Sequence, residues 1–334
     1  MLKKLIRKIL NKLFLRKFDD IKIQKGQLFE RHLEKNIKNI KDLNETNFKI
    51  FSQDYEDGII QYFLKSLDIK NVKFVEIGTQ DYSESNTRYI FETMRCEGLI
   101  IDPTPNLEKK INAILRTWKN TLKIHNDYVN SQNIIEIIQK NSFDKNLDIF
   151  SLDIDGIDYW ILEKLPNKIS KIFIIEYNPY FGSEKEICAP NIEKFDRFKY
   201  HPSGFCWGAS LKAIIKLMIK KGYTFVGTNR LNVNSFFIQN EFIHKIKVDI
   251  PNLNNLSKFT EVKFNVLSSN NKKNVSLKEV EGTINNVDVF DLKNNKLTKF
   301  SEVKKENQIE NSFNYRCPRP RINYFIKNFF KKKI

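Results

Sequence analysis

The sequence lacks the features of a membrane-spanning, secreted or disulfide-bonded protein. Nowhere in its 334 residues is there a run of the roughly 18 to 20 consecutive apolar residues that a membrane-spanning helix needs. Lysines interrupt the N-terminal segment where a signal peptide would carry its apolar core. The cysteines are widely spaced and form no C-x-x-C pair, which argues against zinc and redox sites: Cys96, Cys188, Cys206 and Cys317. We therefore expect a cytoplasmic protein with reduced, structural cysteines.

Glycine is also scarce, at 11 residues, and its placement excludes dinucleotide binding. A dinucleotide site needs the pattern G-x-G-x-x-G, which lets the backbone approach a pyrophosphate at a helix N-terminus. After the apolar run at 72–77 this chain has Gly78, and no further glycine in the turn that follows. A ligand without phosphate tolerates such a polar turn.

Acidic residues are missing from both ends of the chain. Residues 1–18 and 313–334 each carry seven lysines and arginines and no acid. Without these fourteen basic residues, the net charge of +17 falls to +3, from 43 basic and 40 acidic residues. The body of the chain is therefore nearly neutral, which argues against a nucleic-acid partner, because such proteins build a basic face into the fold itself.

Residues 1–18 have the pattern of a basic amphipathic helix, with apolar residues at i, i+3 and i+4 spacing and lysines between them. Such a helix can bind peripherally to an anionic membrane surface, at the inner face of the plasma membrane. The alternative is that it packs its apolar stripe on the rest of the protein. Residues 313–334 repeat the combination of aromatic residues with lysines.

Between the two ends, apolar runs alternate with helical periodicity. Strands are predicted at 72–78, 98–102, 121–127, 147–155 and 171–178. Residues 51–67 are predicted to be a loop followed by a helix, and further helices are predicted at 83–94, 105–116, 131–141 and 158–165. This alternation implies a doubly wound, mostly parallel sheet. A helix at 208–223 and strands at 224–229 and 231–239 follow, and the short turn between the last two makes them antiparallel. The order predicts an α/β fold of the class I methyltransferase (Rossmann-like) type.

The predicted organisation has five parts. Residues 19–50 form a helical lead-in and residues 51–245 the methyltransferase domain, with a long loop at 179–207 that we interpret as a substrate loop or lid. Residues 246–312 are rich in Asn and Lys and are either a small β-appendage or a poorly ordered tail. The basic ends at 1–18 and 313–334 are the other two parts.

Acids and amides stand where the predicted strands end, at the edge where parallel sheets bind ligands. S-adenosylmethionine fits them: Glu76 and Asp81 to its cationic amino-acid end, and Asp102 to the ribose hydroxyls. Asp127 would face the adenine amino group. The predicted cofactor residues are Glu76, Gly78, Asp81, Ser85, Asn86, Asp102, Asp127 and Asp153.

Several motifs together resemble one known family. The segments FSQDYEDGII, FVEIGTQDYSESNT, GLIIDP, LDIFSLDIDGIDYWILEKL, IFIIEYNP and GASLKAIIKLMIKKGYTFVGTN are similar to FkbM-type S-adenosylmethionine-dependent methyltransferases of bacterial surface-polysaccharide clusters. The resemblance covers about residues 51–238 and implies O-methylation of a sugar in a surface glycan, or in its lipid- or nucleotide-linked precursor. The chain departs from the family at Tyr82, where a glycine is common.

The pair Asp153 and Asp155 has a second interpretation. A D-x-D pair after an apolar strand holds a divalent metal in nucleotide-sugar glycosyltransferases, so a metal-dependent glycosyltransferase is an alternative. In a methyltransferase, the same acids could bind Mg²⁺ or another divalent cation, with Glu176 and Asn178 completing the oxygen ligands. A third hypothesis is a catalytically silent, membrane-associated binding module, favoured if the turn at Tyr82 closes the cofactor site.

Methyl transfer to a hydroxyl needs a general base near the same edge of the sheet. His201, in the long loop, is our candidate, with Asp155 as its competitor. Three aromatic residues of the loop are candidates for stacking on sugar faces: Tyr180, Tyr200 and Trp207.

Overall fold

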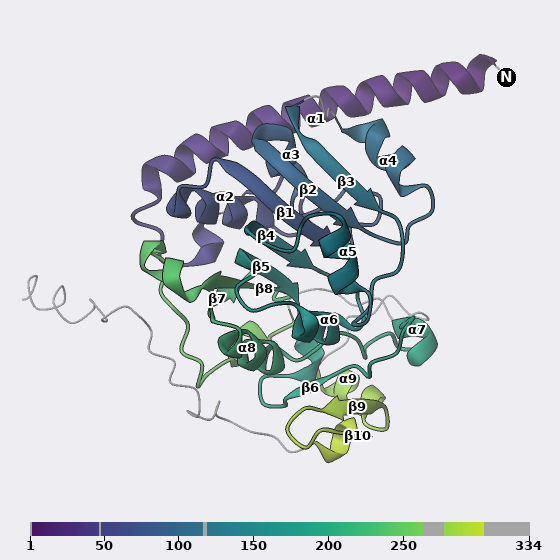
Figure 1. The fold of residues 1–334 in the computed structure, drawn as a ribbon, viewed down its shortest axis with the longest axis vertical. Helices are drawn as coiled ribbons and strands as arrows, with labels where there is room; N and C mark the ends of the chain where they lie inside the picture. Colours follow the sequence, from purple (N-terminus) through teal and green to yellow (C-terminus); the bar gives the residue numbers. More distant parts are fainter. Residues whose placement is uncertain (1, 47, 116–118, 263–276, 304–334) are drawn as a thin grey trace, which may run out of the picture.

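The computed structural model describes residues 2–46, 48–115, 119–262 and 277–303. Its centre is a seven-stranded sheet in the order β3-β2-β1-β4-β5-β8-β7 (Figure 1). The strands are β1 (Asn71–Ile77), β2 (Arg95–Ile101), β3 (Thr121–His125), β4 (Leu147–Leu152), β5 (Ser170–Glu176), β7 (Tyr223–Thr228) and β8 (Asn234–Gln239). The first five pair in parallel, and β8 is antiparallel to both β5 and β7. This order, with its one reversed strand, is the class I methyltransferase topology, and it confirms the predicted fold class.

Helices cover both faces of the sheet. The helices α2 (Glu56–Leu67), α3 (Arg88–Thr93) and α4 (Leu107–Ile114) share one apolar core, and α5 (Ile134–Lys140), α6 (Asp158–Lys164) and α8 (Leu211–Lys220) share the other. Neighbouring strand residues divide between these cores: Phe74 belongs to the first and Val75 to the second. Both faces of the strands are therefore buried, which explains why the strands read as continuous apolar runs.

A single long helix, α1 (Leu2–Asn36), spans the predicted basic helix and part of the predicted lead-in. It ends before a short 3-10 turn, η1 (Leu43–Thr46). Gly26 allows α1 to approach α3 closely, since a Cβ there would lie 2.5 Å from the Tyr89 ring. The Arg88 guanidinium binds the Asp19 carboxylate at 2.7 Å. Among the described residues, no helix is both long enough and apolar enough to cross a membrane.

Two boundaries differ from the predictions for the same reason. The helix expected from Ser83 begins at Arg88, and the strand expected to reach Asp155 ends at Leu152. In each case a backbone N–H binds a carboxylate instead of continuing the helix or strand: Asn86 N–H binds Glu76, at the end of β1, and Ile154 N–H binds Asp158. Both turns lie at the carboxyl edge of the sheet.

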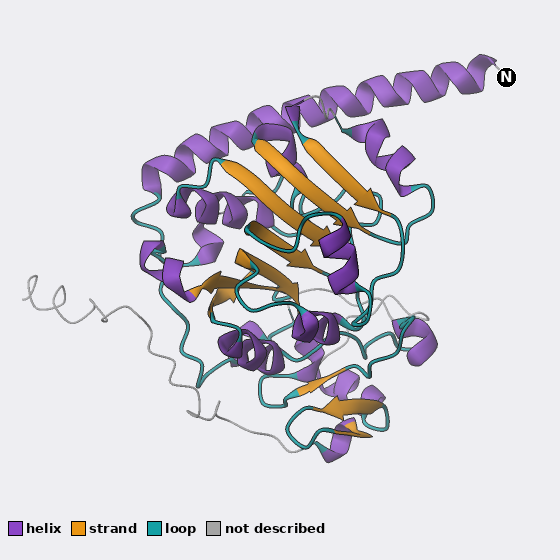
Figure 2. Ribbon diagram, viewed as in Figure 1, coloured by secondary structure: helices purple, strands orange, loops and turns teal. Residues whose placement is uncertain are grey.

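The long loop contains three short elements: η3 (Pro179–Phe181), β6 (Ile187–Cys188) and α7 (Arg197–Tyr200). Strand β6 pairs with β9 (Asp288–Asp291), which pairs with β10 (Lys296–Lys299), so the loop and the appendage form a second small sheet (Figure 2). The core of this small sheet is built by helix α9 (Leu277–Ile284) together with residues of the loop and of β9. These residues are Tyr180, Phe181 and Ile187 of the loop and Val289 of β9. The described part of the appendage therefore has β structure, and the predicted tail at 313–334 lies outside the described residues.

The remaining short elements are η4 (Asn240–Lys245), η5 (Ser257–Phe259) and η6 (Phe300–Glu302). Cys96, Cys188 and Cys206 are buried free thiols, as expected of structural cysteines. Cys317 lies outside the described residues.

Candidate active site

A cavity of about 640 Å³ opens at the carboxyl ends of β1, β2, β4 and β5. The sheet order reverses between β1 and β4, and such switch points are where open α/β sheets bind ligands. Ten residues predicted from the sequence line it: Glu76, Gly78, Asp81, Ser85, Asn86, Asp102, Asp153, Asp155, Glu176 and Trp207. The tertiary fold thus gathers most of the candidate site in one place.

Glu76, at the end of β1, organises one wall of the cavity. Its carboxylate accepts hydrogen bonds from Ser85 Oγ at 2.7 Å and from the backbone N–H groups of Asn86 at 2.8 Å and Thr87 at 3.0 Å. The Thr87 hydroxyl donates a fourth. Burial raises the pKa of Glu76, and these four donors oppose the rise. Glu76 is therefore engaged in holding the Ser-Asn-Thr turn, which explains why helix α3 starts late.

The turn after Gly78 does without further glycines because other residues adopt left-handed backbone. Gln80 has φ of 51° and Tyr82 has φ of 64°. The Tyr82 ring is fully buried in the core between the sheet and α2, α3 and α4, and its hydroxyl lies 2.8 Å from the Thr87 hydroxyl. Tyr82 does not line the cavity. The tyrosine at this position therefore leaves the cavity open.

Asp102, at the end of β2, lines the cavity with a carboxylate whose two oxygens are both held by backbone donors. One carboxylate oxygen accepts the Gln80 N–H at 2.7 Å, and the other accepts the Thr104 N–H at 2.8 Å. Each oxygen keeps a second lone pair, and the side chain lines the cavity although the residue is only 5% exposed. A fixed pair of acceptors of this kind matches two neighbouring hydroxyl groups, as on a ribose.

Asp81 also lines the cavity. Its carboxylate accepts the backbone N–H of Ser83 at 3.0 Å and the hydroxyl of the same residue at 2.5 Å. These bonds, the hydroxyl bond first, lower the pKa of Asp81. Asp81 thus remains a carboxylate beside the cavity, as its predicted role toward a cationic amino group requires.

The prediction for Asp127 is not supported, because this side chain is exposed and does not line the cavity. Its carboxylate accepts its neighbour Tyr128's N–H at 2.7 Å. Tyr128 and Val129 line the cavity instead. The sequence shows which acid follows a strand. Which of the next residues faces the cavity depends on the conformation of the loop, which the sequence does not show.

The half-buried Asp153 and the buried Glu176 form a carboxyl pair where β4 and β5 end. Burial, with added repulsion from Asp155 and Asp158, raises the pKa of Asp153 to about 8. Burial and the charge of Asp153 raise the pKa of Glu176 well above its ordinary value. A side-chain hydrogen bond between the two groups opposes the rise in the pKa of Asp153. A carboxyl group that titrates near the working pH is suited to accept a proton.

Asp155 stands beyond this pair and faces the lid. Its backbone is left-handed, with φ of 53°, and its carboxylate binds the Arg197 guanidinium of α7 at 2.5 Å. Burial raises the pKa of Asp155, and Arg197 opposes that rise. The Asp158 carboxylate holds this turn, because it accepts hydrogen bonds from the backbone N–H groups of Ile154 and Gly156, each at 3.0 Å. The LDIDG-x-D motif is therefore a turn held by its last acid, with the first two acids at the cavity.

The predicted metal set does not form. Within the described ranges, no group of three His, Cys, Asp or Glu side chains is placed to hold a metal ion. The Asn178 side chain is fully buried and engaged: it donates to the carbonyl oxygens of Phe205 and Trp207, both at 2.9 Å, and accepts the Tyr180 N–H at 3.0 Å. Asn178 anchors the two ends of the lid loop to each other, which corrects its assignment as a ligand.

Three further loop predictions fall outside the cavity. His201 Nδ1 lies 2.7 Å from the Ser203 hydroxyl, so His201 is a turn residue and is not retained as the general base. The Tyr200 hydroxyl donates to the Asp288 carbonyl at 2.7 Å, and Tyr180 packs against Phe205 with centroids 5.1 Å apart. Both tyrosines therefore connect the lid to the appendage core.

Other loop residues line the cavity and were missed from the sequence: Glu193, Lys194, Phe195 and Arg197, next to Trp207. The loop carries no periodic pattern that would distinguish its inward side chains.

The SQ-x3-DG motif supports the cavity from outside. The Asp57 carboxylate accepts the N–H groups of Ile50, Phe51 and Ser52 at 2.7 to 2.9 Å. Glu56 accepts the side-chain amides of two asparagines that flank the turn before β8, Asn229 at 2.7 Å and Asn234 at 2.9 Å. Gln53 and Asn234 line the cavity as a result.

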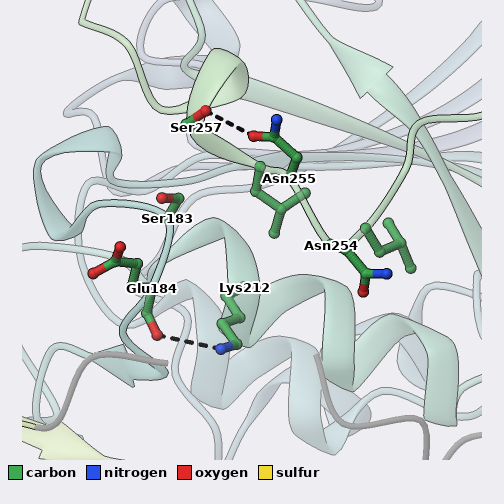
Figure 3. Close-up of a pocket in the computed structure, with 8 residues that line it drawn as sticks. Ser183, Glu184, Lys212, Asn254, Asn255 and Ser257 are labelled. Carbon is green, nitrogen blue, oxygen red and sulfur yellow. Dashed lines mark hydrogen bonds between the residues drawn. The ribbon is translucent and has the colours of Figure 1, made fainter. Parts of the chain in front are cut away.

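A second cavity, of about 180 Å³, lies between the lid, α8 and residues 253–257 (Figure 3). Lys212 Nζ donates to the Glu184 carbonyl oxygen at 3.3 Å on its wall. This second cavity is smaller than the sites that usually hold a cofactor. The larger cavity is therefore the candidate active site.

Comparisons with known proteins found only distant structural likenesses. No protein-family model and no curated protein matches the chain. Among solved structures, the N-terminal domain of EvdMO1 with SAH bound is 8% identical, covering 56% of this chain and 80% of that one, with a TM-score of 0.37. The small RNA methyltransferase HEN1 is 14% identical, covering 54% and 24%, with a TM-score of 0.34. M. capricolum TrmK with S-adenosyl-homocysteine is 14% identical, covering 52% and 64%, with a TM-score of 0.29. At these TM-scores the function of this chain has to be argued from its own site.

Proposed function

We propose that the protein is an S-adenosylmethionine-dependent O-methyltransferase. The observation that carries the proposal is the Asp102 carboxylate, fixed at the end of β2 by the N–H groups of Gln80 and Thr104 and open to the cavity. The charge of the cavity supports it, because eight acidic and two basic residues are among its described lining. Such a wall attracts a cationic sulfonium ligand.

The residues present fit the cofactor. Asp102 would bind the ribose hydroxyls, Asp81 would meet the cationic amino group, and Tyr128 and Val129 would flank the base. When bound, S-adenosylmethionine supplies an electrophilic methyl group. Glu76 acts indirectly, by holding the turn that shapes this side of the cavity. The carboxyl pair lies across the switch point from Asp102, where an acceptor hydroxyl would have to lose its proton.

We assign the proton-accepting role to Asp153, with Glu176 as its hydrogen-bonded neighbour. Aligning a hydroxyl and removing its proton are the two tasks an enzyme has in this reaction. Asp153 is in the cavity, unlike His201, and its raised pKa makes it a stronger base than an ordinary carboxylate. Asp155, paired with Arg197, is better suited to hold the acceptor against the lid.

The acceptor we propose is a sugar hydroxyl of a bacterial surface glycan, or of its lipid- or nucleotide-linked precursor. The resemblance to FkbM-type enzymes supports this class of acceptor. So does the acceptor side of the cavity, which combines the aromatic residues Phe195 and Trp207 with the carboxyl groups of Asp153 and Asp155. Aromatic faces stack on sugar rings, and carboxylates accept hydrogen bonds from their hydroxyls.

The direct test is calorimetric titration of the full chain with S-adenosylhomocysteine. We expect micromolar binding, weakened roughly tenfold to hundredfold by Asp102→Ala, because hydrogen bonds to a charged group are lost. Asp127→Ala is the matched control, an acid at the end of the adjacent strand but outside the cavity, and should bind as the wild type does. Absence of binding in the wild type would overturn the proposal.

The same preparation separates the two alternatives. A metal-dependent glycosyltransferase would bind a nucleotide-sugar with Mg²⁺ and ignore S-adenosylhomocysteine. A silent module would bind neither. No structural observation favours these alternatives, since the metal set does not assemble among the described residues and Tyr82 leaves the cavity open.

A further inference from the structure

The outer face of helix α1 carries exposed apolar side chains. Phe18 is 58% exposed, Ile21 60% and Leu28 63%. Their spacing of three and seven residues places them on one side of the helix, and we call them the outer stripe of α1. A different face of the helix holds α1 to the protein through Gly26 and the buried Leu33.

The helix is held firmly and extends beyond the domain. Arg88 is 3% exposed, and its guanidinium binds both Asp19 of α1, at 2.7 Å, and the carbonyl oxygen of Ser83, at 2.9 Å. Its guanidinium carbon also lies 3.9 Å from the Phe51 ring centroid. From this anchor the N-terminal part of α1 continues past the sheet into open space (Figure 1). The outer stripe begins beside this anchor, on the part of α1 that packs on the protein, and its side chains point away from the core.

Charge identifies the occupant of this face. Residues 1–18 carry seven lysines and arginines and no acid. A second copy of the chain would bring two such segments together and they would repel, whereas an anionic bilayer attracts them. We infer that α1 docks the protein on an anionic lipid surface, with the outer stripe entering the boundary between headgroups and acyl chains and the basic residues contacting the headgroups.

The Arg88 anchor relates this surface to the active site. Ser83 lines the large cavity, so the residue that fixes α1 also contacts the cavity wall. Docking through α1 would hold the cavity near the bilayer, where lipid-linked acceptors are found. The inference about docking stands without the proposed enzymatic activity, because it depends on α1 alone.

The test is co-sedimentation of the full chain with vesicles of phosphatidylglycerol and phosphatidylcholine in equal parts, against vesicles of phosphatidylcholine alone. We expect binding to the anionic vesicles that weakens as salt is added. The double variant Ile21→Gln/Leu28→Gln should lower the partition coefficient by about tenfold or more, because apolar surface no longer enters the bilayer. Both positions are exposed, so the fold should be retained, which circular dichroism would check.

Leu297→Gln is the matched control, since Leu297 in β10 is also exposed, at 55%, but lies far from α1 in the fold. It should bind vesicles as the wild type does. Equal binding by the wild type and the double variant would overturn the inference, as would equal binding to neutral and anionic vesicles. A dimer in analytical ultracentrifugation that the double variant abolishes would assign the stripe to a second copy and also overturn it. Titration of the double variant with S-adenosylhomocysteine reports separately on the proposed function.

Discussion

Gly78 and Asp153 touch through their backbones at the switch point of the sheet. A Cβ on Gly78, whose φ is 87°, would stand 1.5 Å from the Asp153 carbonyl oxygen. The glycine is therefore required by the packing of the ends of β1 and β4, in addition to any approach of a ligand. The two halves of the proposed site, Asp102 on one side and the carboxyl pair on the other, are fixed to each other through this contact.

Replacing Gly78 should therefore do more damage than its positive φ alone implies. Gly182→Ala provides the comparison, because Gly182 has φ of 73° and a Cβ there would meet nothing within 4 Å. We expect Gly182→Ala to cost about 1 to 3 kcal/mol from backbone strain. Gly78→Ala should exceed it by about 2 kcal/mol or more in urea unfolding, because the strands must separate. Similar costs for the two variants would show that β1 and β4 yield easily.

The role of Asp153 predicts a pH profile. As the proton acceptor it must be ionised, so kcat/KM for a glycan acceptor should rise with pH and level off above the pKa of about 8. Asp153→Asn should lower the rate by about a hundredfold to ten-thousandfold and remove the rise of kcat/KM with pH, which is the rising limb of the profile. Its affinity for S-adenosylhomocysteine should stay close to that of the wild type.

Two variants serve as controls for this profile. Glu176→Gln retains a hydrogen-bond donor toward Asp153 and should keep the rising limb with a smaller loss of rate. His201→Ala should have little effect, because His201 is outside the cavity. A limb that disappears in His201→Ala and persists in Asp153→Asn would return the general base to the lid.

Tyr82→Gly tests whether the unusual turn limits cofactor binding. Glycine would relieve the strain of a φ of 64° but would leave the space of a fully buried ring. The lost packing is the larger effect, so we expect a net destabilisation of about 3 kcal/mol in urea unfolding. S-adenosylhomocysteine affinity should not improve. A clear gain in affinity would mean that the tyrosine does constrain the site.

Asp57 predicts how stability changes with pH. Burial raises its pKa from 3.8 to about 6, so the folded state holds this proton more tightly than the unfolded state. Protonated Asp57 therefore stabilises the folded state. This stabilisation is fully present below the unfolded-state pKa of 3.8 and is lost as pH rises through about 6. The destabilisation caused by Asp57→Asn should therefore be larger at pH 4 than at pH 7, by up to roughly 3 kcal/mol. Urea unfolding at both pH values measures it, and an equal cost at both would contradict the prediction.

The sheet could be predicted because each strand carries its own signal. Continuous apolar runs followed by helical periodicity indicated the type and order of β1 to β5, and the short turn near Asn232 indicated the reversed strand β8. Element ends were less predictable. Ser85 and Thr87 look like helix-starting residues, yet they bind Glu76, which is nine or more residues earlier in the sequence.

The candidate site likewise has a part that the sequence predicted and a part that it did not. Residues that end strands, such as Asp102 and Asp153, were found because parallel strands bring their carboxyl ends to one edge. Residues of the long loop were not found reliably: Trp207 lines the cavity, whereas Tyr200 turns toward the appendage. No local pattern distinguishes the two, because their directions depend on how the loop pairs with β9.

The sequence by itself therefore determined the class of fold, the absence of a dinucleotide fingerprint and the basic character of both ends, since composition and periodicity are local properties. Only the tertiary structure decided which acids are available to a ligand. Asp57 and Asp158 are buried carboxyl groups that hold turns through backbone N–H groups and do not line the cavity, whereas Asp102 and Asp153 do line it. The physical reason is that a carboxylate binds whichever donors surround it, and those donors come from segments that only folding brings together.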